Sequence, residues 1–233
     1  MDISIRIGGE AGQGIQSIST ILAKTFVRQD FYVFINQDFA SRIRGGHNFD
    51  QIRISKAPIR AVDDKVHILI ALDQETTSRD MSCLAEGGIM MVDGDTIDFT
   101  SDDPNHLSIP FGQIASEVGK SKIMINSVAT GAAVALMDCE LQPVLNCIKE
   151  QFQQKGSEIL KNNLKSATAG YEFVQQNLKI KSSFTVPSAK TVRHKMLFTG
   201  SQAIALGAMA SGLKFYSGYP HPAASGTGVQ CTA

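Results

Sequence analysis

A glycine-rich turn near the N-terminus carries the first residue types that suggest ligand binding. Residues 8–14 read Gly-Gly-Glu-Ala-Gly-Gln-Gly and directly follow an apolar, β-rich run at 2–7. Where a strand leads through such a turn into a helix, free backbone N–H groups and the positive end of the helix dipole favour a phosphate or carboxylate. We therefore predict a phosphate-facing or cofactor-facing loop. Its candidate binding residues are Gly9, Gly12, Gln13 and Gly14.

The spacing of these glycines argues against two common nucleotide motifs. The order is Gly-x-x-Gly-x-Gly, the reverse of the dinucleotide fingerprint, and no Walker Gly-Lys-Ser/Thr is present. Asp38 is the only candidate for a ribose-binding acid. A structural interpretation stays open, because tight packing of a strand on the next helix also requires glycine.

A second candidate loop combines arginine with glycine. Arg42 and Arg44 lie beside Gly45 and Gly46. A guanidinium offers forked donors to a carboxylate or phosphate, and the glycines let the backbone approach a ligand. Arg44, Gly45 and Gly46 are therefore candidate binding residues, for CoA or another phosphate. The alternative is an exposed loop with solvated arginines.

A turn near the C-terminus is the last candidate. Gly218-Tyr219-Pro220 follows a predicted short strand at 213–217. The carboxyl end of a strand is where α/β folds bind ligands, so Tyr219 and Pro220 are candidates for residues near a substrate. As a lone tripeptide, the turn carries little information.

Other chemistry finds no support in the sequence. The five histidines show no His-x-x-x-His pattern and no adjacent acid, so each is interpreted as a surface or packed residue. The four cysteines include no Cys-x-x-Cys pair, so we predict no metal or iron–sulfur site on this chain, and we assign no catalytic residue.

Composition limits the partners. There are 22 Lys+Arg against 22 Asp+Glu, and the pI is about 7.0, so no basic field favours nucleic acid or an anionic membrane. The sequence has neither a signal-peptide pattern nor an apolar run of about 18 residues. We expect a cytoplasmic protein with free thiols.

Apolar periodicity predicts the elements that position these turns. The strand at 2–7, a helix after the glycine turn and a second, buried strand at 31–36 form a Rossmann-like βαβ opening. A half-exposed strand is predicted at 49–55. The continuous apolar run at 66–72 is typical of a parallel strand covered on both faces.

The alternation then continues with a helix near 74–86, a strand at 89–92 and a helix near 113–120. The predicted class is therefore α/β with a mostly parallel sheet. C-terminal helices follow at 127–137, at 143–154 and from Ser157 onward.

Three segments are expected along the chain. Residues 1–180 form the first domain, and 181–195 form a linker, because periodicity is lost there and Lys, Ser, Thr and Pro accumulate. Residues 196–233 contain a first turn and a helix at 202–212, and are too few to bury a core of their own. We interpret them as the truncated start of a second α/β domain.

Several motifs follow one another in a specific order: the turn at 8–14 with Ile21-Leu22-Ala23, then Arg44-Gly45-Gly46, the strand at 66–73, Asn126 with Gly131, and Gly170-Tyr171. Together they resemble the γ domain of 2-oxoacid:ferredoxin oxidoreductases over residues 1–180. Farther on come Gly200, the run at 202–208, Gly212 and the run at 215–220. These resemble the start of the α domain of the same enzymes, which is known to be fused to γ in this family.

The resemblance implies a subunit of an enzyme that oxidatively decarboxylates a 2-oxoacid to an acyl-CoA, with 2-oxoglutarate as the expected substrate and pyruvate as a related one. It implies thiamine diphosphate with Mg²⁺ between the α and β units, and iron–sulfur clusters on the β subunit or a ferredoxin-like part. The γ domain is expected to be accessory and to adjoin CoA. The expected partners are the β subunit and ferredoxin in a hetero-oligomer, and no cofactor is expected on this chain alone.

The sequence departs from the family at its C-terminal end. Gly-Tyr-Pro usually continues with Ile-Thr-Pro, whose threonine hydroxyl lies near the substrate carboxylate, whereas here His221 and Pro222 follow. We therefore expect a truncated or frameshifted reading, and an isolated chain that is inactive. Two alternatives stay open: a noncatalytic structural or assembly module of that complex, and a free-standing nucleotide-binding α/β protein.

Overall fold

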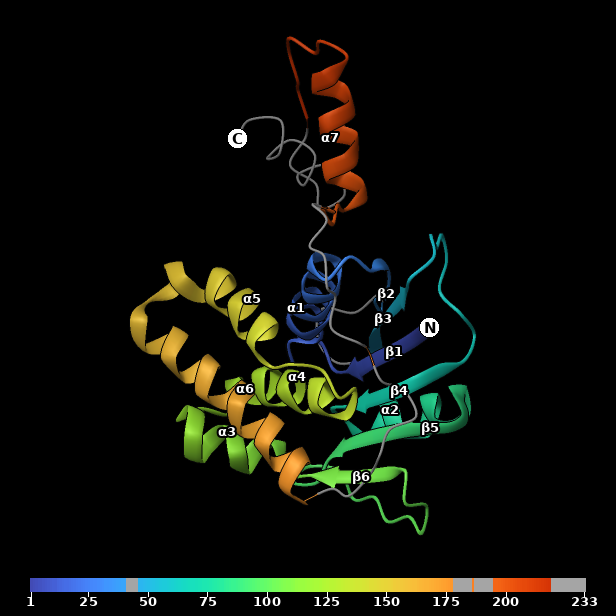
Figure 1. Cartoon of the computed structure of the whole chain (residues 1–233), viewed down its shortest axis with the longest axis vertical. Helices are drawn as coiled ribbons and strands as arrows, with labels where there is room; N and C mark the ends of the chain where they lie inside the picture. Colours follow the sequence, from blue (N-terminus) through green and yellow to red (C-terminus); the bar gives the residue numbers. More distant parts are fainter. Residues whose placement is uncertain (41–45, 178–185, 187–194, 219–233) are drawn as a thin grey trace. The chain divides into compact units, whose positions relative to one another are not determined.

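The computed structural model describes residues 1–40, 46–177, 186 and 195–218 (Figure 1). The chain divides into two compact units, Met1–Lys195 (unit 1) and Met196–Ala233 (unit 2). Among the described residues, no helix is long and apolar enough to cross a membrane.

A six-stranded sheet organises unit 1. Its spatial order is β2-β3-β1-β4-β5-β6. The strands are β1 (Asp2–Gly9), β2 (Tyr32–Asp38), β3 (Asn48–Ser55), β4 (Val66–Ala71), β5 (Leu84–Asp93) and β6 (His106–Ile109). The pairs β1–β4, β4–β5 and β5–β6 are parallel, whereas β3 is antiparallel to both β1 and β2. The α/β class with a mostly parallel sheet is confirmed.

The predicted βαβ opening is present, with a strand inserted into it. β1 and β2 run in the same direction, because each is antiparallel to β3, which lies between them. The strand predicted at 31–36 is present as β2, but its predicted burial was wrong: β2 is an edge strand, and Tyr32 is 37% exposed. The strand predicted at 49–55 is likewise present as β3, but it is not half-exposed, since β3 has neighbours on both sides and most of its residues are buried.

The helices are α1 (Ile15–Arg28), α2 (Gln74–Asp80), α3 (Phe111–Gly119), α4 (Ile125–Leu136), α5 (Gln142–Phe152), α6 (Ser157–Asn177) and, in unit 2, α7 (Gly200–Ala210), with short 3₁₀ turns η1 (Met81–Cys83), η2 (Lys122–Met124) and η3 (Gln153–Lys155). The helix predicted near 74–86 ends early, because η1 follows α2 and β5 begins at Leu84. β6 has only four residues and was not predicted.

The two faces of the sheet carry different helices. Alternation along β4 places Ile68 and Ile70 in the larger core, which also contains apolar residues of α1 and α4, and places Leu69 and Ala71 in a smaller cluster on the other face. Arg6 pairs in register with Leu69 and contacts α2. Helix α2 therefore covers the second face.

Helices α4 and α6 pack at unusually short range. A Cβ atom added at Gly131 of α4 would lie 1.9 Å from the carbonyl oxygen of Ala167, and one at Gly170 of α6 would lie 2.1 Å from that of Val128. The backbones of the two helices thus touch without intervening side chains. This contact, drawn in yellow-green and orange in Figure 1, closes the larger core.

Unit 2 contains one described helix, α7. Its N-terminus has a capping box, in which Thr199 Oγ1 accepts from Gln202 N at 3.2 Å and Gln202 Oε1 accepts from Thr199 N at 2.9 Å. The helix at 202–212 was thus predicted to within two residues. The short strand predicted at 213–217 was wrong, since that segment has no strand pairing.

Candidate functional site

The glycine-rich loop leads from β1 into α1, as predicted. Gly12 has φ +96° and Gly14 has φ +80°, a region that residues with a side chain avoid. Gly14 is the N-cap of α1, and no side chain caps the helix there. In the first turn of α1, Ser17 N already donates to Gly14 O at 2.9 Å, and the N–H groups before it lie at the helix N-terminus, where an anion site requires them.

Asn126 is a neighbour of the loop that sequence spacing did not reveal. A Cβ atom at Gly14 would lie 1.9 Å from Asn126 Nδ2, so the start of α4 packs directly on the N-cap of α1. Gly14 is therefore required both by its backbone conformation and by this contact. Asn126 was quoted for the family resemblance, but nothing in its spacing from Gly14 indicated that the two meet.

Gln13 holds the loop from within. Its Oε1 accepts from Glu10 N at 2.7 Å, and its Nε2 donates to Leu72 O at 3.1 Å. Gly9 lies beneath it, where a Cβ atom would be 2.4 Å from Gln13 Oε1. The structure thus uses Gln13 and Gly9 to fix the loop against β4, and direct ligand contact by either residue stays a prediction.

Two clefts border the loop. One of about 550 Å³ lies at the carboxyl ends of β1, β4 and β5, and one of about 340 Å³ lies over the first turn of α1. Glu10 and Gly12 line both clefts. Helix α1 packs on both β1 and α4 (Figure 1).

The larger cleft is acidic. Glu10, Asp73 and Asp93 line it, with Lys122 as its cation. Asp73 Oδ1 caps α2 by accepting from Thr76 N at 2.7 Å, and Asp93 Oδ2 accepts from Thr96 Oγ1 at 2.9 Å. These carboxylates stabilise the ends of the elements, and their charge disfavours a phosphate in this cleft.

The smaller cleft combines the glycine loop with the base of the arginine loop. Arg44 and Gly45 lie outside the described residues, while Gly46 has φ +82°. Asn48 Oδ1 accepts from Ala40 N at 2.8 Å, and its Nδ2 donates to Gly46 O at 3.0 Å. Asn48 thus joins the two ends of the 41–45 segment, and both Asn48 and Ala40 line the smaller cleft. The glycine loop and two residues that flank the 41–45 segment, Ala40 and Asn48, thus border the same cleft.

Sequence reasoning missed Asn48. Its role depends on the register of the β2–β3 pair, in which Asp38 lies opposite Phe49, and a register cannot be read from a single strand. Asp38 itself lies on the edge strand and lines a different cavity, of about 430 Å³, with His47 and Arg79. Because β3 separates β2 from β1, Asp38 is not the neighbour of the glycine loop that a dinucleotide site needs.

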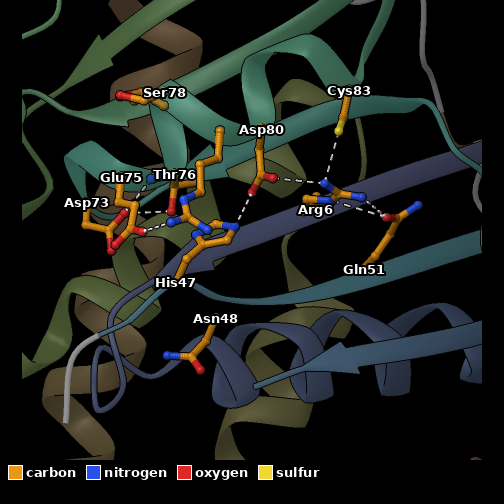
Figure 2. A network of polar contacts seen from close by, with 12 residues as sticks. Arg6, His47, Asn48, Gln51, Asp73, Glu75, Thr76, Ser78, Asp80 and Cys83 are labelled. Atoms are coloured by element: carbon orange, nitrogen blue, oxygen red, sulfur yellow. Dashed lines mark hydrogen bonds and ion pairs between the residues drawn. The ribbon is translucent and has the colours of Figure 1, made fainter. Parts of the chain in front are cut away.

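A buried charge network lies under that third cavity (Figure 2). Arg6 Nη1 donates to Asp80 Oδ1 at 3.0 Å and to Cys83 Sγ at 3.1 Å, and Arg6 Nη2 donates to Gln51 Oε1 at 2.7 Å. The side chains of Arg6 and Asp80 are only 11% and 6% exposed. The network therefore ties β1, β3 and α2 together.

His47 is the fifth group of this network. Its Nε2 lies 3.0 Å from Asp80 Oδ2, although the contact is not aligned as a hydrogen bond. The side chain is 10% exposed, so the interpretation as a packed histidine agrees with the structure. The acid beside it was not visible in the sequence, because Asp80 lies on α2, far along the chain.

The remaining candidates are not placed together. Tyr219 and Pro220 lie outside the described residues. In the described part of the chain, no group of three or more His, Cys, Asp or Glu residues is arranged to hold a metal ion. Cys83, Cys139 and Cys147 are free thiols.

Comparison with known proteins decides the family. Residues 4–173 match the model of the pyruvate ferredoxin/flavodoxin oxidoreductase family. The chain belongs to this family. It is 24% identical to the 2-oxoacid:ferredoxin oxidoreductase subunit alpha of Saccharolobus solfataricus, over 98% of this chain and 42% of that protein.

Solved structures agree with this assignment. A 2-oxoglutarate:ferredoxin oxidoreductase from Magnetococcus marinus, solved with 2-oxoglutarate, coenzyme A and succinyl-CoA bound, has a TM-score of 0.87 and 26% identity over 99% of this chain and 41% of that one. The keto/oxoacid ferredoxin oxidoreductase gamma subunit of Geobacter sulfurreducens has a TM-score of 0.63 and 25% identity, over 74% of this chain and 95% of that one. The chain thus spans about two fifths of its longer relatives.

Proposed function

We propose that this chain supplies the γ unit and the start of the α unit of a 2-oxoacid:ferredoxin oxidoreductase that acts on 2-oxoglutarate. The observation that carries the proposal is a likeness over 99% of the chain to an enzyme with 2-oxoglutarate and CoA bound. That likeness includes unit 2, whereas the stand-alone gamma subunit covers 74% of the chain.

In the proposed reaction, the C1–C2 bond of the 2-oxoacid breaks and carbon dioxide leaves. The remaining acyl group is oxidised by two electrons, which pass to two ferredoxins, and CoA sulfur bonds to the acyl carbon as its thiol proton is released. Thiamine diphosphate with Mg²⁺ would supply the carbanion chemistry, and iron–sulfur clusters would transfer the electrons. The described residues offer no ligand set for a cluster, so we place the clusters on partner subunits.

Within this scheme, unit 1 binds and positions rather than reacts. The polar groups nearest the glycine loop are already used within the protein, Gln13 by Glu10 and Leu72 and Asp73 by the α2 cap. These contacts also favour the second candidate function, a noncatalytic assembly module. CoA binding by the loop separates the two functions.

We place the phosphate end of CoA in the smaller cleft. The first turn of α1 opens into it without an acidic residue, and Asn48 brings the ends of the Arg44-containing segment to its rim. The larger cleft is less suitable, because Asp73 and Asp93 line it in addition to Glu10, which borders both clefts, and these carboxylates would repel a phosphate. Gly12 and Gly14 line this cleft and are assigned to this role, with Arg44 and Gly45 as candidates from the sequence, whereas Gly46 lines the cavity beside Asp38.

An assay of the reconstituted complex tests the substrate. The chain is combined with the β subunit and the remainder of the α unit, and viologen reduction is followed with 2-oxoglutarate, pyruvate or 2-oxoisovalerate in the presence of CoA. We expect CoA-dependent activity with the highest kcat/KM for 2-oxoglutarate, and none from the isolated chain. A higher kcat/KM for another oxoacid would contradict 2-oxoglutarate as the proposed substrate. Viologen reduction by the chain alone would contradict its proposed dependence on the other units.

The CoA site is tested in the same complex. Alanine keeps the backbone N–H of residue 12 but disfavours φ +96°, so the N–H is expected to turn away from the phosphate in Gly12→Ala. Loss of one hydrogen bond to a charged group should raise the KM for CoA by about tenfold, with little change in the KM for the oxoacid. Ile159→Ala, on the exposed start of α6, serves as the control. Unchanged affinity for CoA in Gly12→Ala would favour the assembly module.

A further inference from the structure

The outer edge of β2 is a row of backbone groups without partners in the fold. β2 lies at one end of the strand order and pairs only with β3, in an unbroken register over all seven of its residues. Among the described residues, no other hydrogen bond between backbone groups involves this strand. Because alternate residues of an antiparallel strand direct their N–H and C=O groups to opposite sides, the outer side of β2 offers free donors and acceptors.

The opposite edge of the sheet is protected against pairing, and β2 is not. β6 has only four residues, and Pro110 follows it directly as the N-cap of α3. β2 is seven residues long and contains no proline, lysine or arginine, and no bulge interrupts its register with β3. Short strands, proline, lysine and bulges are the features by which natural sheets keep an edge from pairing with another strand. β2 is therefore suited to such pairing.

The side chains of β2 are also incompletely covered. No residue of the strand is buried, whereas six of the eight residues of the neighbouring β3 are. Val33, Phe34 and Ile35 are apolar and only half-buried, and Tyr32 is 37% exposed. A strand added to this edge would cover these side chains as well as satisfy the backbone.

We propose that the outer edge of β2 binds β2 of a second copy of this chain, antiparallel and around a two-fold axis at Ile35. This register pairs all seven residues of one strand with all seven of the other. Ile35 then lies opposite Ile35 of the second copy. Phe34 lies opposite Asn36, and Val33 lies opposite Gln37. The two six-stranded sheets join into one continuous sheet.

Charge favours the same register. Asp38 is the only charged residue of β2, and the register places it opposite Tyr32 of the second copy. Lys195 Nζ lies 3.7 Å from the ring centroid of Tyr32. Because directly opposite side chains lie on the same face, the Asp38 carboxylate of the second copy comes beside this ammonium group. The two-fold axis repeats the contact at the other end of the strand pair.

Lys195 can accept this second carboxylate. Its Nζ donates to Asp30 O at 2.7 Å and lies 2.9 Å from Asp30 Oδ1, and an ammonium group has three donors. Any other register would separate Asp38 from Tyr32 and lose both ion pairs. Self-complementary charge thus identifies a second copy of this chain as the partner, because an isologous interface must match its own surface.

The size of the contact sets its strength. Seven residues on each side are fewer than the roughly 20–30 of a standard interface, so we expect a reversible dimer that depends on protein concentration. The ion pairs are exposed, so added salt should weaken the dimer modestly. The inference does not depend on the proposed function.

Sedimentation velocity of the full 233-residue chain over a range of concentrations measures the dimer. Asp38→Lys places a lysine beside Lys195 of the second copy and is expected to raise the dissociation constant about tenfold. Asn36→Lys/Asp38→Lys adds a basic residue in mid-strand, at an exposed position, and should abolish the dimer. Asp102→Lys is the control: it makes the same change of charge at an exposed residue before β6, and should have no effect.

Hydrogen–deuterium exchange locates the contact in the same samples. We expect peptides that cover 32–38 to exchange several-fold more slowly at high protein concentration in the wild type and in Asp102→Lys, and equally at all concentrations in the double variant. Peptides of β6 should not change.

Three results would overturn the proposal. The first is a wild-type chain that stays monomeric up to its solubility limit. The second is a dimer that protects another region, such as α7 with its exposed Ile204, while β2 exchanges as in the monomer. The third is equal weakening by Asp38→Lys and Asp102→Lys, because association would then follow net charge and not the register of β2.

Discussion

Glycine serves two different purposes in two regions of unit 1. In the loop before α1, Gly12 has φ +96°, and a Cβ atom there would meet nothing within 4 Å. In the α4–α6 pair, Gly131 and Gly170 are helical, and added Cβ atoms would lie 1.9 and 2.1 Å from backbone carbonyl oxygens. The loop needs the conformational freedom of glycine, whereas the helix pair needs its small size.

The two needs have different energetic consequences. Strain at a positive φ costs about 1–2 kcal/mol for a residue with a side chain, and it is local. A contact between a methyl group and a backbone carbonyl oxygen cannot be relieved by a side-chain rotation, so whole helices must shift. The helix pair should therefore tolerate substitution less than the loop that borders the clefts.

The largest effect is expected at the helix pair. Gly131→Ala and Gly170→Ala should each lower the free energy of unfolding by roughly 2–3 kcal/mol, because overpacking outweighs the gain of about 1 kcal/mol in helix propensity. The double variant should lose less free energy of unfolding than the two single variants together, since one separation of α4 from α6 relieves both contacts. Urea denaturation measures all three. Gly207→Ala in α7, where a Cβ meets nothing within 4 Å, is the control and should not destabilise.

Gly14 needs both the conformational freedom and the small size of glycine, so its substitution should lower the free energy of unfolding by an intermediate amount. Gly14→Ala faces φ +80° and a contact at 1.9 Å, but the contact is with the side chain of Asn126, which can move. We expect the free energy of unfolding to fall by about 2 kcal/mol. Asn126→Ala in the same chain should restore part of it, leaving the backbone strain. A full rescue in thermal melts would show that strain contributes nothing.

Gly12 isolates the backbone strain. Gly12→Ala is expected to destabilise by about 1 kcal/mol, since no atom opposes the methyl group. Gly12→Asn should lose less, because asparagine tolerates a positive φ better than alanine. Equal melting temperatures for the wild type and Gly12→Ala would mean that this turn adjusts at no cost.

The sequence predicted one of these regions far better than the other. The loop was located because its signal is local, a short apolar strand followed at once by closely spaced glycines. The contact of Gly131 with Ala167 joins two helices, and apolar periodicity reports only which face of each helix is buried. The motif Gly170-Tyr171 was recognised by resemblance, without the reason that a backbone requires it.

The same limit explains the errors in the sheet and the site. The run at 31–36 is apolar, but strand order placed it at an edge, and order is a property of the whole sheet. Two neighbours that the sequence did not reveal depend on tertiary contacts or strand register. These are Asp80 beside His47, and Asn48 between Ala40 and Gly46. Local residue types thus located the glycine loop, whereas long-range contacts place Ala40 and Asn48 at the cleft over the first turn of α1.

The smallest expected effect on stability comes from a change of charge without a change of backbone geometry, which the glycine substitutions do not test. His67 Nδ1 accepts from Ser4 N at 3.0 Å, and burial lowers the pKa of His67 below its usual value, although Asp2 and Asp63 partly oppose this. Below about pH 6.5 the unfolded chain takes up a proton that folded His67 resists, so this contribution to stability is present at pH 7 and is lost on acidification. In His67→Asn the amide oxygen replaces the Nδ1 acceptor and does not titrate. Stability between pH 7 and pH 5 should therefore fall less in the variant than in the wild type when measured by urea denaturation. Parallel curves would show that protonation of His67 is not linked to unfolding.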